Sequence, residues 1–145
     1  MEMNLIPIGL VKNNITEPKR ESWESVISEI IINEDSKEAL SRIEEFSHII
    51  VIYWMHKVSQ SQRSIMQVHP KGDRSLPLVG ALASRSPARP NPIGITTVKL
   101  LDRRDNVLKV IGLDAIDGTP VLDIKPYIPG NDSPTEAKTP GWITT

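Results

Sequence analysis

The chain contains no cysteine among its 145 residues, and its aromatic residues are few: one phenylalanine, two tyrosines and three tryptophans. The absence of cysteine excludes disulfides, thiolate nucleophiles and cysteine-ligated zinc sites. No uninterrupted apolar run reaches the roughly 18 residues that a membrane-spanning helix needs. The N-terminus also lacks the basic start and the apolar core of a signal peptide. We therefore expect a cytoplasmic protein with no membrane segment.

Neither sign of charge is in excess, because 17 basic and 18 acidic residues give a formal net charge of -1. Proteins that hold nucleic acid by charge alone are strongly basic, so an RNA partner would need a local basic patch. The chain lacks the glycine-rich signatures of dinucleotide-binding folds and P-loops, and it lacks a nucleophile elbow. Its three histidines have no ligand spacing with neighbouring acids, so we expect no metal site.

Twelve prolines argue against a helical bundle, since proline inside a helix breaks it. The length of the chain suggests one domain. Alternating and β-branched segments predict strands over residues 5–11, 23–32, 49–55, 95–101, 107–113 and 121–124. We expect a small, mainly β domain over residues 1–130, followed by a polar tail over residues 131–145. A closed or nearly closed barrel is expected, because closure removes exposed sheet edges.

One short helix is expected in this β domain. Asp35 and Glu38 have the spacing of a capping box, and apolar residues follow at helical spacing. These apolar residues are Ala39, Leu40, Ile43 and Phe46. Glu38 and Arg42 are four residues apart, so they would pair on the helix surface.

Three further segments have a clear character. Residues 49–55 are almost continuously apolar, which predicts a strand buried on both faces. Residues 58–77 are polar and without periodicity, and a loop this long is usually functional or mobile. Residues 80–83 are small and apolar, which suits a packed strand.

Residues 85–94 form a proline-rich loop that bears most directly on function. Their order is Arg-Ser-Pro-Ala-Arg-Pro-Asn-Pro-Ile-Gly. Proline fixes φ and keeps its neighbours extended, and Gly94 permits a close approach that a side chain would forbid. The pattern predicts a stiff loop presenting Arg85 and Arg89, whose guanidinium groups suit carboxylate or phosphate. On these residues alone, a solvated connection and a binding loop both remain open.

Three long stretches carry a resemblance to a known family. Residues 84–94 add a serine before the loop just described, and residues 117–127 read Asp-Gly-Thr-Pro-Val-Leu-Asp-Ile-Lys-Pro-Tyr. Residues 43–51 read Ile-Glu-Glu-Phe-Ser-His-Ile-Ile-Val and precede Tyr-Trp and His-Lys pairs. Together they resemble the TrmO (TsaA-like) family of S-adenosylmethionine-dependent tRNA methyltransferases. The resemblance implies a homodimer that binds S-adenosyl-L-methionine and uses tRNA as its substrate.

The resemblance also implies site residues. Implied cofactor contacts are Pro18, Lys19, Arg20, His56, Lys57, Arg85, Ile95, Ala115, Ile116, Asp117 and Gly118. Implied substrate contacts are Arg89, Asn91, Lys125 and Tyr127. Lys19 departs from the family pattern, in which the proline and the arginine are adjacent.

The acceptor that the resemblance implies is N6 of threonylcarbamoyladenosine, beside the anticodon. This nitrogen already bears a carbonyl, so it needs to lose its proton as it attacks the methyl group. His56 or Asp117 is the expected proton acceptor, and Arg85 or Arg89 would hold the threonyl or the cofactor carboxylate. We therefore expect Arg85, His56 and Asp117 to be catalytic. The modified base would have to leave the anticodon stack.

Two other functions stay open at this point. The first is methyl transfer from the same cofactor to another acceptor, because bacterial members carry a further segment after this domain that the 145 residues do not include. The second is a non-catalytic RNA-binding barrel, which predicts RNA affinity without cofactor binding. The near-neutral charge counts against the second function.

Overall fold

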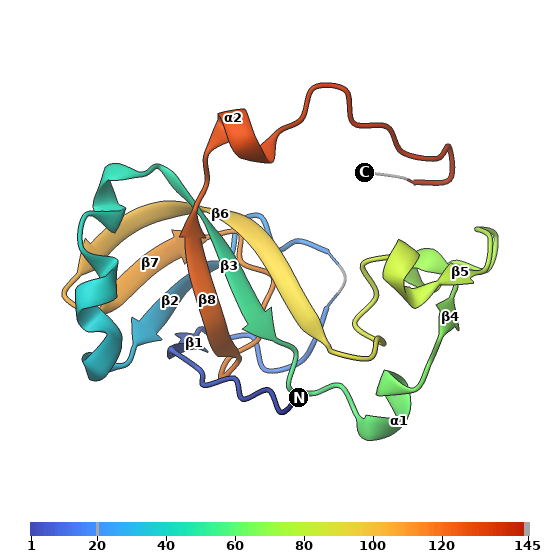
Figure 1. Ribbon diagram of the computed structural model, residues 1–145, viewed down its shortest axis with the longest axis horizontal. Coiled ribbons are helices and arrows are strands. Elements are labelled where there is room, and N and C mark those ends of the chain that lie inside the picture. The colour runs from blue at the N-terminus through green and yellow to red at the C-terminus, as the bar shows by residue number, and fades with distance from the viewer. Residues whose placement is uncertain (20, 144–145) are drawn as a thin grey trace. The chain divides into compact units, whose positions relative to one another are not determined.

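A computed structural model gives the fold and describes residues 1–19 and 21–143 (Figure 1). Six strands follow one another around a closed barrel in the order β1-β2-β7-β6-β3-β8, and all neighbouring pairs are antiparallel. Their bounds are β1 Gly9–Lys12, β2 Ile27–Ile32, β3 His48–Trp54, β6 Ile93–Arg104, β7 Val107–Ile111 and β8 Pro120–Pro126. The expected mainly β barrel is confirmed.

The chain divides into two compact units, which are described separately. The barrel unit comprises Met1–His56 and Ile93–Tyr127, and the loop unit comprises Lys57–Pro92 and Ile128–Thr145. The loop unit contains α1 Gln60–Arg63, β4 Gln67–Val68, a 3-10 turn at Pro70–Gly72, β5 Val79–Gly80, a 3-10 turn at Ala81–Ala83 and α2 Pro129–Asp132. The boundary expected at residue 130 stays a prediction, because a compact unit is not shown to fold alone.

The core fills the barrel and comes from the alternation of its strands. In β2 the residues Ser28, Ile30 and Ile32 are buried while their neighbours are exposed. The fully buried apolar side chains include Val11, Ile30, Ile32, Ile49, Val51, Val98, Leu108, Val110, Leu113 and Val121. Strand β3 was expected to be buried on both faces, and this was wrong: alternate residues of β3 are only half-buried. A barrel wall has one inward face, so only every second residue enters the core.

The expected helix after residue 34 is not an α-helix. Two 3-10 helices, Glu34–Leu40 and Ile43–Glu45, stand in its place. Arg42 lies between them with φ of 72°, a left-handed conformation that ends a right-handed helix. The expected capping box is absent, because Asn33 is the cap residue and its side chain makes no cap hydrogen bond. The expected pair of Glu38 with Arg42 is replaced by a pair of Arg42 with Glu45.

Several strand boundaries also differ from the expectation. The first two strands begin only at Gly9 and Ile27, so their polar or irregular leaders lie outside the sheet. Residues 80–83 were expected to be a strand, but only Gly80 belongs to one, and Ala81–Ala83 form a 3-10 turn. The strands expected over residues 95–101 and 107–113 correspond to β6 and β7, which form a hairpin with Lys99 opposite Ile111 and Arg104 opposite Val107.

Antiparallel closure places particular connections at the same end of the barrel. The strands β1, β3 and β7 finish where β2, β6 and β8 begin. We call this end, which carries the β7–β8 connection, the Asp117 end. The opposite end, which follows the last residue of β8, is called the Tyr127 end. The six residue steps from Pro120 to Pro126 separate the two ends by about 20 Å.

Candidate functional site

The Asp117 end is organised by the side chain of Asn13. Its Nδ2 donates to Ser28 Oγ and to the Ala115 carbonyl, both at 2.9 Å, and its Oδ1 accepts from Ile15 N at 2.9 Å. The backbone N–H of Asn13 donates to Asp117 Oδ1 at 3.0 Å. One side chain and its own backbone therefore join the ends of β1 and β2 to the β7–β8 connection.

The turn in the β7–β8 connection is held by backbone hydrogen bonds. Asp117 N donates to the Ile15 carbonyl at 2.7 Å, and Gly118 N donates to the Val11 carbonyl at 2.8 Å. Gly118 has φ of 81°, which favours glycine over residues with a side chain, so Asp117 and Gly118 form the tight turn that an Asp-Gly pair favours. Asp117 itself is exposed. The connection thus presents a carboxylate from a fixed backbone.

A second polar cluster at this end joins two strands, β3 and β6, to the β7–β8 connection. The hydroxyl of Tyr53 donates to Asp114 Oδ1 at 2.7 Å and lies 3.2 Å from Thr96 Oγ1. The hydroxyl of Thr96 also donates to Asp114 Oδ1. Burial of the phenol, together with the neighbouring negative charge of Asp114, raises the pKa of Tyr53 above its ordinary value. Tyr53 therefore stays a hydrogen-bond donor throughout the neutral range.

Gly94 makes room for the buried ring of this cluster. A β-carbon at residue 94 would lie 2.4 Å from Cε2 of Tyr53, a distance that real β-carbons do not show. The close approach predicted for Gly94 is therefore confirmed. Tyr53 is 4% exposed, so its predicted place in the core is confirmed as well.

In the loop unit, residues 84–91 are braced from inside. Arg89 Nη1 donates to the carbonyls of Ser84 and Ser86 at 3.0 and 3.1 Å. Arg63 Nε donates to the Pro90 carbonyl at 2.7 Å, and Arg63 Nη2 donates to Asn91 Oδ1 at 3.3 Å. Arg89 uses one guanidinium nitrogen to stabilise its own loop, so it has a structural role as well as being a candidate for binding a ligand.

Arg85 differs from Arg89 in its surroundings. It is exposed, and within residues 1–19 and 21–143 it makes no hydrogen bond or ion pair. Its guanidinium therefore keeps all its donors for a ligand. The loop that was expected to present two arginines presents one of them freely.

The predicted site residues fall into three groups. At the Asp117 end of the barrel unit lie Pro18, Lys19, His56, Ile95, Ala115, Ile116, Asp117 and Gly118. In the loop unit lie Lys57, Arg85, Arg89 and Asn91. At the Tyr127 end lie Lys125 and Tyr127, so the structure does not bring these two to the Asp117 end. Arg20 lies outside the described residues.

Lys19 and Tyr127 already contact other residues of the barrel unit. Lys19 Nζ lies 4.9 Å from the centre of the Trp23 ring and donates to the Ser22 carbonyl at 3.1 Å. The indole of Trp23 donates back to the Lys19 carbonyl at 2.9 Å. At the other end, Tyr127 N donates to the His48 carbonyl at 3.1 Å, and the two rings meet edge to face.

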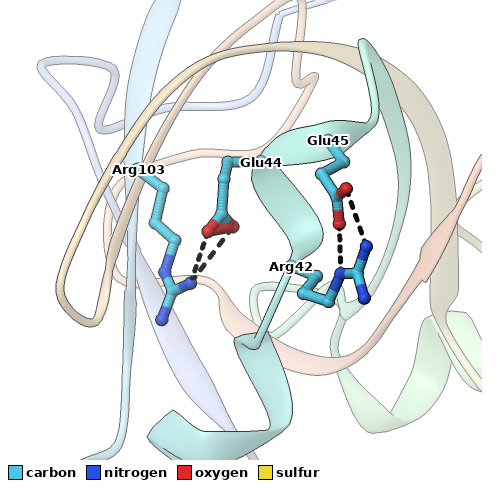
Figure 2. A network of polar contacts seen from close by, with 4 residues as sticks. All are labelled: Arg42, Glu44, Glu45 and Arg103. Atoms are coloured by element: carbon cyan, nitrogen blue, oxygen red, sulfur yellow. Dashed lines mark hydrogen bonds and ion pairs between the residues drawn. The ribbon is translucent and has the colours of Figure 1, made fainter.

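A pocket of about 300 Å³ also lies on the barrel unit, away from the Asp117 end. Its lining residues are Lys37, Glu38, Ser41, Arg42, Glu44, Arg103 and Asp105. Figure 2 shows that Arg103 pairs with Glu44 and that Arg42 pairs with Glu45, and Lys37 pairs with Asp105 at 3.2 Å. The lining is thus largely neutralised by its own ion pairs.

Sequence reasoning missed four residues that build the Asp117 end: Asn13, Tyr53, Thr96 and Asp114. Tyr53 and Thr96 gave no signal of this role, since both alternate normally within strands. Asp114 stands three residues before the Asp-Gly turn that was singled out, and Asn13 directly follows the first strand. A polar residue just beyond a strand end was the available signal for these two.

Comparison with known proteins decides the family. The family model described as the tRNA-methyltransferase O N-terminal domain matches residues 11–133. The chain belongs to this family. The match contains all three resembling stretches and every predicted site residue.

Relatives with named functions agree with this membership. A probable S-adenosyl-L-methionine-binding protein of Methanothermobacter thermautotrophicus is 41% identical and covers 92% of this chain and 96% of its own. The tRNA (adenine(37)-N6)-methyltransferase of Mus musculus is 41% identical over 66% of this chain but only 22% of its own. The crystal structure of TrmO from Pseudomonas aeruginosa superposes with a TM-score of 0.77 at 27% identity. This match covers 97% of our chain and 61% of the crystallised chain.

The described residues contain neither a membrane-spanning helix nor a cluster of metal ligands. No helix within residues 1–19 and 21–143 is long and apolar enough to cross a membrane. In the same part of the chain, no three histidine or acidic side chains gather as metal ligands.

Proposed function

We propose that this protein transfers a methyl group from S-adenosyl-L-methionine to N6 of threonylcarbamoyladenosine in tRNA. Membership of the family makes the chain a methyltransferase domain that uses S-adenosyl-L-methionine, the cofactor named for the archaeal relative. The observation that carries the proposal is the family match over residues 11–133. The mouse relative, whose name specifies adenine 37 of tRNA, supports the choice of acceptor.

The residues at the Asp117 end fit the cofactor chemically. The adenine ring needs an apolar surface, and Ile95 is 51% exposed there. The ribose hydroxyls and the amino group need acceptors, and Asp114 and Asp117 present exposed carboxylates. The cofactor carboxylate needs a cation, and the family resemblance implies Arg85 for this role. When bound, the cofactor supplies a methyl group that is already activated on a sulfonium.

The protein then has to position the acceptor and accept a proton. Methyl transfer to N6 would break the methyl–sulfur bond of the cofactor and release S-adenosylhomocysteine, and the N6 proton would pass to Asp117 or His56, directly or through a water. Asp117 suits this role because its backbone is fixed while its side chain is exposed. Arg85 or Arg89 would hold a carboxylate, and fixed donors of this kind lower the entropy cost of alignment.

The proposal includes contacts with tRNA and a homodimer. Asn91, Lys125 and Tyr127 remain candidate substrate contacts, with Lys125 and Tyr127 serving parts of the RNA that reach the Tyr127 end. Leu10 and Ile31 are paired across β1 and β2 and are 51% and 37% exposed, which supports a partner surface on the barrel wall. Leu10→Lys should then raise the monomer fraction in light scattering. A tRNA substrate also implies the cytoplasm.

Calorimetric titration tests the cofactor directly. The purified protein should bind S-adenosyl-L-methionine and S-adenosylhomocysteine, and Arg85→Ala should weaken binding roughly tenfold or more. Arg104→Ala is the matched control, since Arg104 is exposed and, among the described residues, forms an ion pair only with Asp102. Absence of binding to either compound by well-folded protein would contradict the proposal and favour an RNA-binding barrel.

A further inference from the structure

The cluster of Tyr53, Thr96 and Asp114 lies next to all three resembling stretches along the chain, although none of the stretches contains it. Tyr53 follows the stretch 43–51 on β3, Thr96 follows Gly94 on β6, and Asp114 precedes the turn that begins the stretch 117–127. Three segments that are distant in sequence therefore share one carboxylate oxygen. The cofactor contacts above name Asp114 only as one of two exposed carboxylates, and they do not explain why two hydroxyls hold one of its oxygens.

The geometry leaves one oxygen of Asp114 available. Oδ1 accepts hydrogen bonds from both hydroxyls, while Oδ2 has no partner among the described residues. Asp114 is exposed, although the phenol that holds it is buried. A carboxylate oxygen has two acceptor positions, so Oδ2 can accept two hydrogen bonds. The two hydrogen bonds to Oδ1 fix the orientation of the side chain.

We propose that Asp114 Oδ2 binds the two vicinal ribose hydroxyls of the nucleoside cofactor at the Asp117 end. A cis-diol presents two O–H donors side by side, which matches one oxygen with two open acceptor positions. In dinucleotide-binding folds an acidic side chain likewise hydrogen-bonds a ribose hydroxyl. A sulfonium has no N–H or O–H to donate, so it gains no hydrogen bond from such an oxygen. Tyr53 and Thr96 are positioning residues, since they act through Asp114.

This inference rests on the proposed function, because it assumes that the cofactor binds at this end. Asp114→Asn is a sharp test: the amide oxygen can still accept from Tyr53 and Thr96, while the amide nitrogen replaces the free acceptor by a donor. Asp102→Asn is the matched control, since it also removes the charge of an exposed carboxylate. Asp102 lies near the end of β6 that is opposite to Thr96. Thermal melts of both variants establish that they fold.

The ligands are S-adenosyl-L-methionine, S-adenosylhomocysteine and 5′-methylthioadenosine, each titrated calorimetrically. All three carry the ribose diol, but only the first two carry the amino acid and only the first carries a sulfonium. We expect Asp114→Asn to weaken all three by a similar factor, roughly 10- to 100-fold for hydrogen bonds to a charged group. Asp102→Asn should leave all three unchanged.

The other outcomes separate the failures. Weaker binding of S-adenosyl-L-methionine and S-adenosylhomocysteine only would show that Asp114 contacts the amino acid part of the cofactor, and it would overturn the inference. Weaker binding of S-adenosyl-L-methionine alone would show that Asp114 contacts the sulfonium, and it would also overturn the inference. Unchanged binding would overturn the inference and leave the proposed function intact. Failure of the wild-type protein to bind any of the three would overturn both.

A second measurement needs no variant. The wild-type protein is titrated with 5′-methylthioadenosine and with its 2′,3′-dideoxy analogue. The inference predicts at least tenfold weaker binding of the analogue, and equal affinities would overturn it even if Asp114→Asn failed to fold.

Discussion

Gly94 on β6 lies directly against the ring of Tyr53 on β3, its partner in the strand register. The contact is so close that the ring occupies the space that a side chain at residue 94 would need. The ring in turn carries the hydroxyl that holds Asp114. One glycine in the proline-rich loop thus determines how a carboxylate at the Asp117 end is presented.

Gly94→Ala should therefore destabilise the fold. Inserting a methyl group into a filled site typically costs about 1–3 kcal/mol, and here the nearest ring atom would be 2.4 Å away. Chemical denaturation measures the free energy of unfolding. Gly80→Ala is the control, because a β-carbon there meets no atom within 4 Å. Equal stability of the two variants would contradict the packing described here.

Asn13→Ala should loosen the Asp117 end. It removes the partners of Ile15 N, Ser28 Oγ and the Ala115 carbonyl, and a buried polar group left without a partner costs about 1–3 kcal/mol. Hydrogen exchange should show faster exchange of amides in residues 115–118. Asn14→Ala, at an exposed neighbouring position, should change neither exchange nor stability. Unchanged amide exchange in Asn13→Ala would contradict the role of Asn13 in holding the Asp117 end together.

The barrel was predictable because strand alternation is a local signal. The alternating segments around residues 27–32, 95–101 and 107–111 depend on neighbouring residues only, and the strands found there follow them. The expected helix failed for the opposite reason. The left-handed conformation of Arg42 and the use of the Asn33 amide to bind the Pro7 carbonyl depend on distant parts of the chain.

The candidate site was predictable only in part. Gly94 signalled a close approach, although the sequence did not name Tyr53 as the group that approaches. Arg85 and Arg89 looked equivalent in the sequence, but Arg89 binds two carbonyls of its own loop. Asp114 is held by the hydroxyls of residues on β3 and β6, and no local sequence pattern predicts such a contact.

The two arginines should therefore respond differently to substitution. Arg85→Ala should lower methyl transfer roughly tenfold or more with no change in melting temperature, because the exposed side chain makes no hydrogen bond or ion pair within the described part of the protein. Arg89→Ala should lower stability by about 1–2 kcal/mol, since two loop carbonyls lose a charged donor. Melting curves and initial rates measured on the same samples separate the effects. A large loss of stability in Arg85→Ala would contradict the distinction.

Stability above pH 10 should depend on Tyr53. The pKa of its phenol is raised in the folded protein above the ordinary value of 10.0, so the folded state keeps a proton that the unfolded state releases. This contribution is fully present below pH 10 and is lost as the pH rises from about 10 toward the folded pKa. Melting temperatures between pH 8 and 11.5 should fall more steeply in the wild type than in Tyr53→Phe. Tyr127→Phe is the control, and parallel curves for Tyr53→Phe and wild type would refute the prediction.

Methyl transfer to a defined tRNA measures whether threonylcarbamoyladenosine is the acceptor. Two preparations of one tRNA are compared, one carrying threonylcarbamoyladenosine and one with unmodified adenosine at the same position, with a radiolabelled methyl group on S-adenosyl-L-methionine. We predict incorporation into the modified tRNA only, on N6 of the modified nucleoside by mass spectrometry, and a loss of incorporation in Arg85→Ala. Equal labelling of both tRNAs, or labelling of neither by protein that binds the cofactor, would contradict threonylcarbamoyladenosine as the acceptor.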